Sequence, residues 1–337
     1  MPTVSPDMVD LARWVRALKG LDDLRDRCGV GVGVGVGNIR AVSWNLDLGG
    51  VDGVLERRLR GQSEVLAALR PDVLALQECT FWDADEERRL LWMTDVLGMV
   101  PVRMEPSRLG DGRNHTALLY RPSTLRLIGR RTLGAGVYHH ALIRARLRPV
   151  HTEGDRHDVL VLATHLTHID GDRRLAEARC LTDYAGTLPG MPDRALLLGD
   201  LHCPGADDVE PVDWERLPRN LHARHRLIAP DGSFGPMDRR ALAVLVNAGW
   251  IDPQALTGRA RAATVGHGGE GIALRLDHIL VRGLPVESYR THDTPEARAV
   301  SDHLPVVLDT SLMEPRLPGR ESKPRPPGPV SGRGTPV

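Results

Sequence analysis

The 337-residue sequence predicts a fold that combines α-helices and β-strands, either α/β or α+β. Two observations carry this prediction: short runs rich in Val and Leu recur along the chain, and longer segments with apolar residues at helical spacing lie between them. Several of the runs are apolar throughout, as strands buried on both faces are. Because a chain of this length can bury an ample core, it needs no disulfides to fold.

The predicted elements are taken in chain order. Strands are expected within residues 39–46, 72–78, 157–166, 194–202 and 275–281. Helices are expected within residues 55–69, 85–97, 173–185 and 237–248. The connections between them are too varied for a simple repeat, and the sequence predicts one large domain over residues 38–313.

The two ends of the chain differ from this middle part. Residues 7–27 place apolar side chains at helical spacing among charged ones, which predicts an amphipathic helix. In residues 29–37 glycine occupies only odd positions, so G-x-G-x-x-G cannot occur there, and the lysine of a P-loop is missing. We therefore interpret residues 1–37 as a helix followed by a Gly/Val linker, with an edge strand as the alternative for the linker. Residues 314–337, rich in Pro, Gly, Ser and basic residues, predict a disordered tail.

Charge and cysteine usage bound the class of protein. The 44 basic and 44 acidic residues balance, and the chain has only two Phe and four Tyr. The composition therefore gives little support for a basic or base-stacking surface that binds nucleic acid, although it does not exclude one. The four cysteines form no C-x-x-C pair, which argues against a disulfide framework or a structural zinc site. With neither a signal-peptide pattern nor an 18-residue apolar run, the sequence predicts a cytoplasmic protein without a membrane span.

Polar residues follow several of the predicted strands directly. If these strand ends lie on one rim, they form a polar site; the residues are Asn45, Glu78, His165 and Asp200. Alternate residues of an extended segment share a face, so Asp47 is expected beside Asn45, and His202 beside Asp200. Taken singly, each residue also has an ordinary structural explanation, such as a turn residue, a solvated strand end or a core histidine.

Six short motifs occur in a characteristic order between about Asn38 and Asp309: "SWNLD", "PDVLALQE", "ATHL", "LLLGDLH", "LRLDHILV" and "SDHLPV". In this succession the chain resembles the endonuclease/exonuclease/phosphatase superfamily, the metal-dependent phosphoesterases similar to deoxyribonuclease I. The resemblance implies a four-layer sandwich, in which two mixed β-sheets pack face to face between outer helices. It also implies one active site at the strand ends.

Carried over motif by motif, the resemblance implies a metal site with oxygen ligands. Glu78 corresponds to the principal ligand, and Asn45, Asp47 and Asp302 lie on the metal side. A hard carboxylate supplemented by water and phosphate oxygens suits Mg²⁺, or Mn²⁺, better than a soft ligand set would.

The resemblance also implies the catalytic groups. Asp277 orients His303, which acts either as a general base or as a cation that binds phosphate; both roles stay open. Asp200 positions or deprotonates the attacking water, and His165 binds phosphate oxygens or assists the leaving group. The implied reaction is in-line attack of water on phosphorus without a covalent intermediate.

One position departs from the family pattern G-D-x-N, because His202 stands where the family has Asn. Imidazole can also donate an N–H, but it is bulkier and can ligate Zn²⁺ or Mn²⁺, so both the metal preference and the rate depend on it. Neighbouring Cys203 is expected to be incidental, and His168 to be a histidine at the rim of the site. The remaining histidines of two local clusters are interpreted as surface or packing residues: His139, His140, His222 and His225.

The sequence therefore predicts a Mg²⁺-dependent phosphoesterase with a nuclease as the first expectation for its substrate. A small phosphodiester, a phospholipid or a sugar phosphate is the second. The alternative from another class is a catalytically weakened member that binds a phosphorylated ligand or a protein partner. The sequence indicates neither an oligomeric state nor endo- against exo-action.

Overall fold

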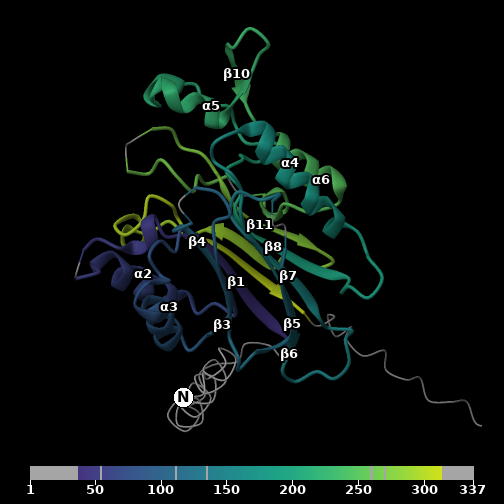
Figure 1. The fold of residues 1–337 in the computed structure, drawn as a ribbon. Coiled ribbons are helices and arrows are strands. Elements are labelled where there is room, and N and C mark those ends of the chain that lie inside the picture. Colours follow the sequence, from purple (N-terminus) through teal and green to yellow (C-terminus); the bar gives the residue numbers. More distant parts are fainter. Residues whose placement is uncertain are drawn as a thin grey trace, which may run out of the picture. The chain divides into compact units, whose positions relative to one another are not determined.

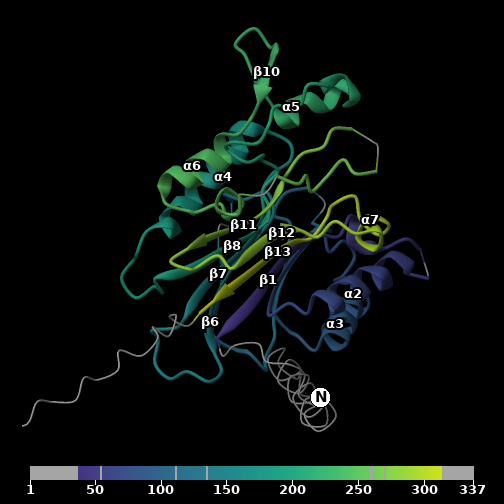
Figure 2. The ribbon, with the colours of Figure 1, turned by 180° about the vertical axis from the view of Figure 1, so that it is seen from behind.

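Two β-sheets pack face to face, and helices cover their outer faces (Figures 1 and 2). The computed structural model describes residues 37–53, 55–110, 112–133, 136–258, 261–268 and 271–312. The expected mixed sheets between outer helices are thereby confirmed. The predicted helix over 7–27, the Gly/Val segment before Gly37 and the predicted tail lie outside the described residues.

The first sheet has six strands in the order β12-β13-β1-β2-β4-β3. Only β1 and β2 run parallel, which makes the sheet mixed. Its strands are β1 (Asn38–Asn45), β2 (Val73–Gln77), β3 (Val100–Pro106), β4 (His115–Tyr120), β12 (Ser288–Thr291) and β13 (Val306–Ser311).

The second sheet has five strands in the order β11-β8-β7-β6-β5, with β7 and β8 parallel. Its strands are β5 (Leu125–Leu133), β6 (Leu142–Pro149), β7 (Val159–His165), β8 (Arg194–Asp200) and β11 (Asp277–Arg282). A separate hairpin is formed by β9 (Arg226–Ile228) and β10 (Phe234–Met237). Neither β5 nor β6 was among the predicted strands, because arginines interrupt the apolar pattern in both.

The helices lie close to their predicted positions. Against the first sheet lie α2 (Arg57–Leu69) and α3 (Ala84–Leu97), and against the second lie α4 (Gly171–Leu181) and α6 (Arg240–Ala248). Shorter helices are α5 (His222–His225), α7 (Pro295–Arg298), η1 (Leu48–Gly50), η2 (Thr182–Ala185), η3 (Trp214–Arg216), η4 (Arg219–Leu221) and η5 (Pro253–Leu256). Within the described residues, no helix combines the length and the apolar character that crossing a bilayer requires.

Several helix boundaries differ from the prediction, and two of these differences have clear local reasons. The α6 helix begins at Arg240 rather than Met237, because Met237 ends β10 and the Asp238 carboxylate accepts the backbone N–H of Arg240. The α4 helix begins at Gly171, where the Asp170 carboxylate caps it by accepting the N–H of Asp172.

Side-chain alternation along the strands sorts residues into three layers of core. In β1, Ile39 and Ala41 pack between the sheets, whereas Val42 and Trp44 pack against α2 and α3. In β8, Leu196 and Leu198 pack between the sheets, whereas Ala195 and Leu197 pack against α4 and α6. Asn45 in β1 and Asp200 in β8 follow the same alternation, so their side chains lie at the end of the layer between the two sheets.

Candidate active site

The candidate site lies at one end of the intersheet layer, where strands from both sheets finish or begin. In the second sheet, the last residue of β7, His165, pairs with Asp200 at the end of β8. Asp200 in turn pairs with Asp277, the first residue of antiparallel β11. In the first sheet, Asn45 ends β1 beside Gln77, the last residue of β2. The register therefore brings the polar ends together.

Asn45 joins the two sheets at this end. Its side-chain amide donates to Glu78 Oε1 at 3.3 Å and to Asp200 Oδ2 at 3.1 Å, so it stands between carboxylates from different sheets. Its Oδ1 accepts the backbone N–H of Asp47 at 3.0 Å. Because Asn45 and Asp200 are fully buried, these contacts are shielded from water.

Three site residues have left-handed backbone conformations that L-residues adopt at a cost. The φ angles are 50° at Asp47, 54° at Glu78 and 46° at His202. Carboxylates hold two of these turns: Glu78 Oε2 accepts the N–H of Leu48 at 3.1 Å, and Asp200 Oδ1 accepts the N–H of His202 at 2.9 Å. The predicted proximity of Asp200 and His202 therefore arises from a turn after β8 and not from strand alternation.

Asp277 and His303 form a buried pair, with 2.8 Å between Asp277 Oδ2 and His303 Nδ1. Burial opposes a charge on His303, but Asp277, Asp200 and Asp302 outweigh it and hold the pKa of the imidazole well above its usual range. These carboxylates therefore favour the cationic form of His303.

The turn that carries His303 is anchored to β1. The Ser301 hydroxyl donates to the Asn45 carbonyl at 2.8 Å and accepts the N–H of His303 at 3.1 Å. The indole N–H of Trp44 donates to the carbonyl of His303 at 2.9 Å. Thus Trp44 and Asn45, adjacent in β1, align His303 with the rest of the site.

Asp200 is electrostatically crowded. Burial and the nearby charge of Asp277 raise its pKa to about 8, although His303, the N–H of His202 and Asn45 favour its ionised form. A buried carboxylate poised near neutral pH is typical of a group that exchanges protons during catalysis.

The carboxylates on the open side can supply oxygen ligands. Glu78 is half-buried, Asp302 is exposed, and Asp47 pairs with Arg58 Nη2 at 2.6 Å. Burial and the charge of Asp302 raise the pKa of Asp47, and Arg58 opposes that shift. Carboxylate oxygens with access to water are a donor set that fits Mg²⁺.

On the other side of Asp200 lies a group of histidines, the histidine cluster: His139, His140, His165, His168 and His202. The Nε2 atoms of His165 and His202 are 2.8 Å apart. The ring of His140 stacks on His165 with centroids 3.9 Å apart. In His140, His165 and His202, burial is the main cause that lowers the pKa well below the usual range, so these three imidazoles are neutral.

The interpretation of His139 and His140 as surface or packing residues was incomplete. Both are buried, and His140 packs on a predicted site residue. His139 contacts His140 and His168, and His168 reaches His202. The signal was a histidine pair just before β6, whose first residue lies opposite the end of β7. Since β6 was not among the predicted strands, this position could not be inferred.

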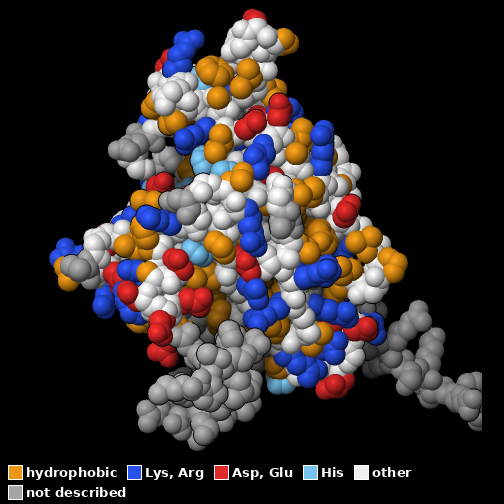
Figure 3. Space-filling view, in the orientation of Figure 1, with side chains coloured by type: hydrophobic (Ala, Val, Ile, Leu, Met, Phe, Trp, Pro, Cys, Tyr) orange, Lys and Arg blue, Asp and Glu red, His pale blue; other side chains and the backbone are white. Residues whose placement is uncertain are grey.

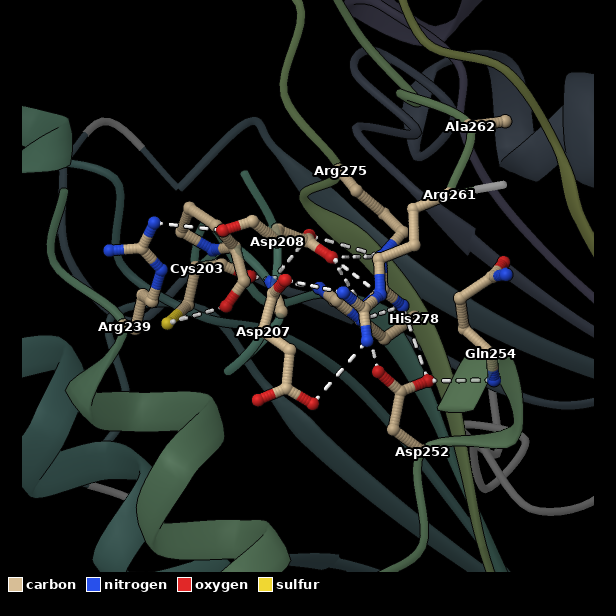
Figure 4. Close-up of polar contacts among 12 residues, drawn as sticks. Cys203, Asp207, Asp208, Arg239, Asp252, Gln254, Arg261, Ala262, Arg275 and His278 are labelled. Atoms are coloured by element: carbon tan, nitrogen blue, oxygen red, sulfur yellow. Dashed lines mark hydrogen bonds and ion pairs between the residues drawn. The ribbon is translucent and has the colours of Figure 1, made fainter. Parts of the chain in front are cut away.

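A buried ionic network supports the loop that follows His202 (Figure 4). The Arg275 guanidinium pairs with Asp252 at 2.7 Å and with Asp208 at 3.1 Å. Next to it, His278 Nε2 lies 2.8 Å from the carbonyl of Cys203. These contacts tie the loop to β11, the strand that carries Asp277. They also border a pocket of about 620 Å³ lined by Asp208, Arg261 and Arg275 among others.

Cys203 is not suited to be a nucleophile. It is fully buried, its thiol lies 3.5 Å from the carbonyl of Asp238, and burial raises its pKa to about 11. Among the described residues, the free thiols are Cys79, Cys180 and Cys203.

The predicted site residues thus have different places. Contacts in the buried centre join Asn45, His165, Asp200, His202, Asp277 and His303, and half-buried Glu78 reaches this group through the amide of Asn45. At the edge, Asp47 faces Arg58 and Asp302 is exposed beside His303. The supporting roles of Trp44 and Ser301 were not predicted, because both are made by contacts across the chain.

Comparisons with known proteins support the family and the fold. A model of the "Endonuclease/Exonuclease/phosphatase family" matches residues 42–303. The fold is similar to an endonuclease/exonuclease/phosphatase from Bacteroides vulgatus, with TM-score 0.57, 15% identity, and 82% of this chain and 99% of that chain covered. No curated protein matches the sequence.

Two further solved structures have a similar fold. One is the human Nocturnin catalytic domain with bound sulfate, with TM-score 0.53, 18% identity, and 83% of this chain and 95% of that chain covered. The other is a mannosyl-6-phosphatase from Bacteroides thetaiotaomicron, with TM-score 0.54, 16% identity, and 81% of this chain and 99% of that chain covered. At these identities the likeness concerns the fold.

Proposed function

The chain belongs to the endonuclease/exonuclease/phosphatase family, whose members hydrolyse phosphoesters, and on that basis we propose that it is a Mg²⁺-dependent phosphoesterase that uses water as its nucleophile. The observation that carries the proposal is the joining of Glu78, Asn45 and Asp200 by one amide, next to the buried pair of Asp277 and His303. This arrangement supports the proposal, because groups that could accept a proton, carry positive charge and hold a metal ion lie at one end of the sandwich.

Each group has a role that follows from its surroundings. Asp200, once ionised, can accept a proton from the attacking water, and Asn45 holds its Oδ2 in place. His303, kept cationic by Asp277, can stabilise negative charge on the phosphoryl group. The neutral ring of His165 can bind a phosphate oxygen or assist the leaving group.

The metal site belongs to the same proposal. Glu78 would hold the ion with support from Asn45, Asp47 and Asp302, all of which offer oxygen atoms. When bound, Mg²⁺ would supply positive charge that stabilises the phosphoryl oxygens in the transition state. Asn45 Oδ1 accepts one hydrogen bond and keeps a second lone pair for this purpose.

A nucleic-acid phosphodiester is the first expectation for the substrate. A small phosphodiester or a sugar or lipid phosphate is the second, and the surface charge favours it. On the face that Figure 3 shows, basic and acidic side chains intermingle over the described residues, and no large basic area stands out. The structurally similar mannosyl-6-phosphatase is named for a sugar phosphate, which agrees with this second expectation.

The test is a substrate panel with matched variants. Plasmid DNA, RNA, lipid phosphodiesters, sugar phosphates and bis(p-nitrophenyl) phosphate are incubated with Mg²⁺, Mn²⁺ or a chelator. We expect Mg²⁺-stimulated release of product from at least one substrate, and a loss of at least about 100-fold in Glu78→Gln. Glu64→Gln, an exposed change in α2, is the control and is expected to have no effect. Equal turnover of both variants would contradict the assignment of Glu78.

A further inference from the structure

Three ligand atoms on the histidine side of Asp200 surround one point. His165 Nε2 and His202 Nε2 are 2.8 Å apart. Asp200 Oδ2 lies 3.4 Å from His202 Nε2 and 3.8 Å from His165 Nε2. All three atoms belong to side chains with at most 12% exposure. The triangle is therefore preformed in a buried setting.

The size of this triangle matches a transition-metal site. Around Zn²⁺ with bonds of about 2.0–2.1 Å, the atoms of a tetrahedral ligand set lie roughly 3.3–3.4 Å from one another. The three separations fall on both sides of that value. Two imidazole nitrogens with one carboxylate form a donor set of Zn²⁺, Mn²⁺ or Fe²⁺, whereas Mg²⁺ prefers oxygen ligands.

The polar contacts that the structure shows for His165 lie on the Nε2 side of its ring. There it meets another Nε2, although a hydrogen bond between neutral imidazoles satisfies only one lone pair. A metal ion at this point would use the lone pairs of both rings.

The local charge also favours a cation. Asp200 and Asp277 are two fully buried carboxylates. They share one neighbouring cation, His303, whose Nδ1 lies 2.8 Å from Asp277 and 3.8 Å from Asp200. His303 therefore pairs more closely with Asp277 than with Asp200. A divalent ion on Asp200 Oδ2 would stabilise the ionised form of that carboxylate.

We propose that His165, Asp200 and His202 bind one divalent transition-metal ion of the Zn²⁺ class, separate from the oxygen-ligand site at Glu78. This ion would occupy His165 Nε2 and Asp200 Oδ2, so water or a phosphate oxygen bound to it would replace the direct contacts proposed above for these two side chains. The two sites flank Asn45, whose amide contacts a carboxylate of each. Three protein ligands leave a fourth position open for water or a phosphate oxygen. His202, the residue that departs from the family pattern, is the ligand that makes the site specific to this chain.

The outer histidines form a competing group, since nitrogen atoms of His139, His140 and His168 also lie within 4.8 Å of one another. However, two of these rings already have hydroxyl partners: His140 Nδ1 is 2.6 Å from Ser107 Oγ, and His139 Nδ1 is 3.3 Å from Thr167 Oγ1. That group also lacks a carboxylate. We therefore assign the ion to the inner triangle.

The test measures metal binding by the full chain without substrate, so its result is independent of the phosphoesterase proposal. The protein is stripped with a chelator and titrated with Co²⁺ and Zn²⁺ in excess Mg²⁺, with visible absorption and bound-metal analysis as readouts. We expect one tightly bound ion and the absorption bands of a low-coordinate Co²⁺ site. His202→Asn and His165→Asn are each expected to weaken binding by more than about 100-fold.

Two controls locate the site. Glu78→Gln removes the oxygen-ligand site and His168→Asn disturbs the outer group, and both are expected to keep the tightly bound ion. Thermal melts verify that each variant is folded. Unchanged Co²⁺ affinity and spectrum in both His202→Asn and His165→Asn would overturn the proposal, as would loss of the ion in His168→Asn alone.

Discussion

A single side chain, Asn45, connects the groups that matter most at the residue scale. Its amide contacts Glu78 from one sheet and Asp200 from the other, and its backbone carbonyl holds Ser301 beside His303. One asparagine therefore sets the relative positions of the proposed Mg²⁺ ligand, the proton acceptor and the cation. Asp277 tunes two of these groups, because its charge raises the pKa of both Asp200 and His303.

Replacing Asp277 by Asn tests this tuning. Removing the negative charge should lower the pKa of Asp200 and that of His303. If activity requires ionised Asp200 and cationic His303, both limbs of the pH profile of kcat/KM then move to lower pH. We expect this acid shift together with a rate loss of about 100-fold or more, measured with bis(p-nitrophenyl) phosphate.

Asp213→Asn is the control for that measurement, since Asp213 is exposed and outside the site. It should leave both limbs in place. A profile of Asp277→Asn that keeps the wild-type limbs would show that Asp277 does not set the protonation of either group.

At the scale of elements, the parallel pairing of β7 with β8 positions His165 and Asp200. The two strands approach closely at Gly199, which precedes Asp200 and lies opposite Thr164, because glycine has no side chain to hold them apart. A Cβ on Gly199 would lie 2.1 Å from the backbone oxygen of Thr164, well inside contact distance. Glycine is therefore required here by the approach of the neighbouring strand.

Gly199→Ala should force β7 and β8 apart beside the site. We expect a loss of about 1–3 kcal/mol or more in the free energy of unfolding, measured by urea denaturation, and a marked fall in activity. Gly129→Ala in β5 is the matched control, because a Cβ there meets no heavy atom within 4 Å. Equal stability of the two variants would mean that the strands adjust freely at Gly199.

At the scale of the whole described domain, the two sheets share one apolar layer. Ile39 and Val306 from the first sheet pack in the same cluster as Val161, Leu198 and Ile279 from the second. Since the site is assembled from the ends of both sheets, its geometry depends on this shared layer. We expect the two sheets to unfold in one cooperative step.

Leu198→Ala tests that expectation. The side chain is fully buried between the sheets, so its truncation should cost about 2–5 kcal/mol of stability. Trp44 and Trp250 lie on opposite outer sides of the sandwich, so near-UV circular dichroism and tryptophan fluorescence each report on both sheets. If the sheets unfold together, both signals should show the same single transition. Val209→Ala, at a side chain 86% exposed, should change little. Two separate transitions in either signal would contradict a shared core.

Much of the fold was predictable because the relevant signals are local. Apolar runs marked β1, β2, β7, β8 and β11, and helical spacing marked the four longer helices. By contrast, β3, β4, β5, β6, β12 and β13 were not among the predicted strands. Neither β5 nor β6 is a continuous apolar run, because arginines alternate with apolar residues in β6 and two adjacent arginines lie within β5. Their absence from the predicted sheet also concealed the position of the histidines that precede β6.

The sequence by itself determined the fold class, the family motifs and the residue types at the strand ends, because each depends on neighbours along the chain. Only the tertiary structure decided which of those residues meet. The pairing of Asp200 with Asp277, the amide bridge of Asn45 and the stacking of His140 on His165 join residues far apart in sequence. Such contacts arise from strand register and sheet packing. For this physical reason the change at His202 could be seen in the sequence, while the triangle that it forms with His165 and Asp200 could not.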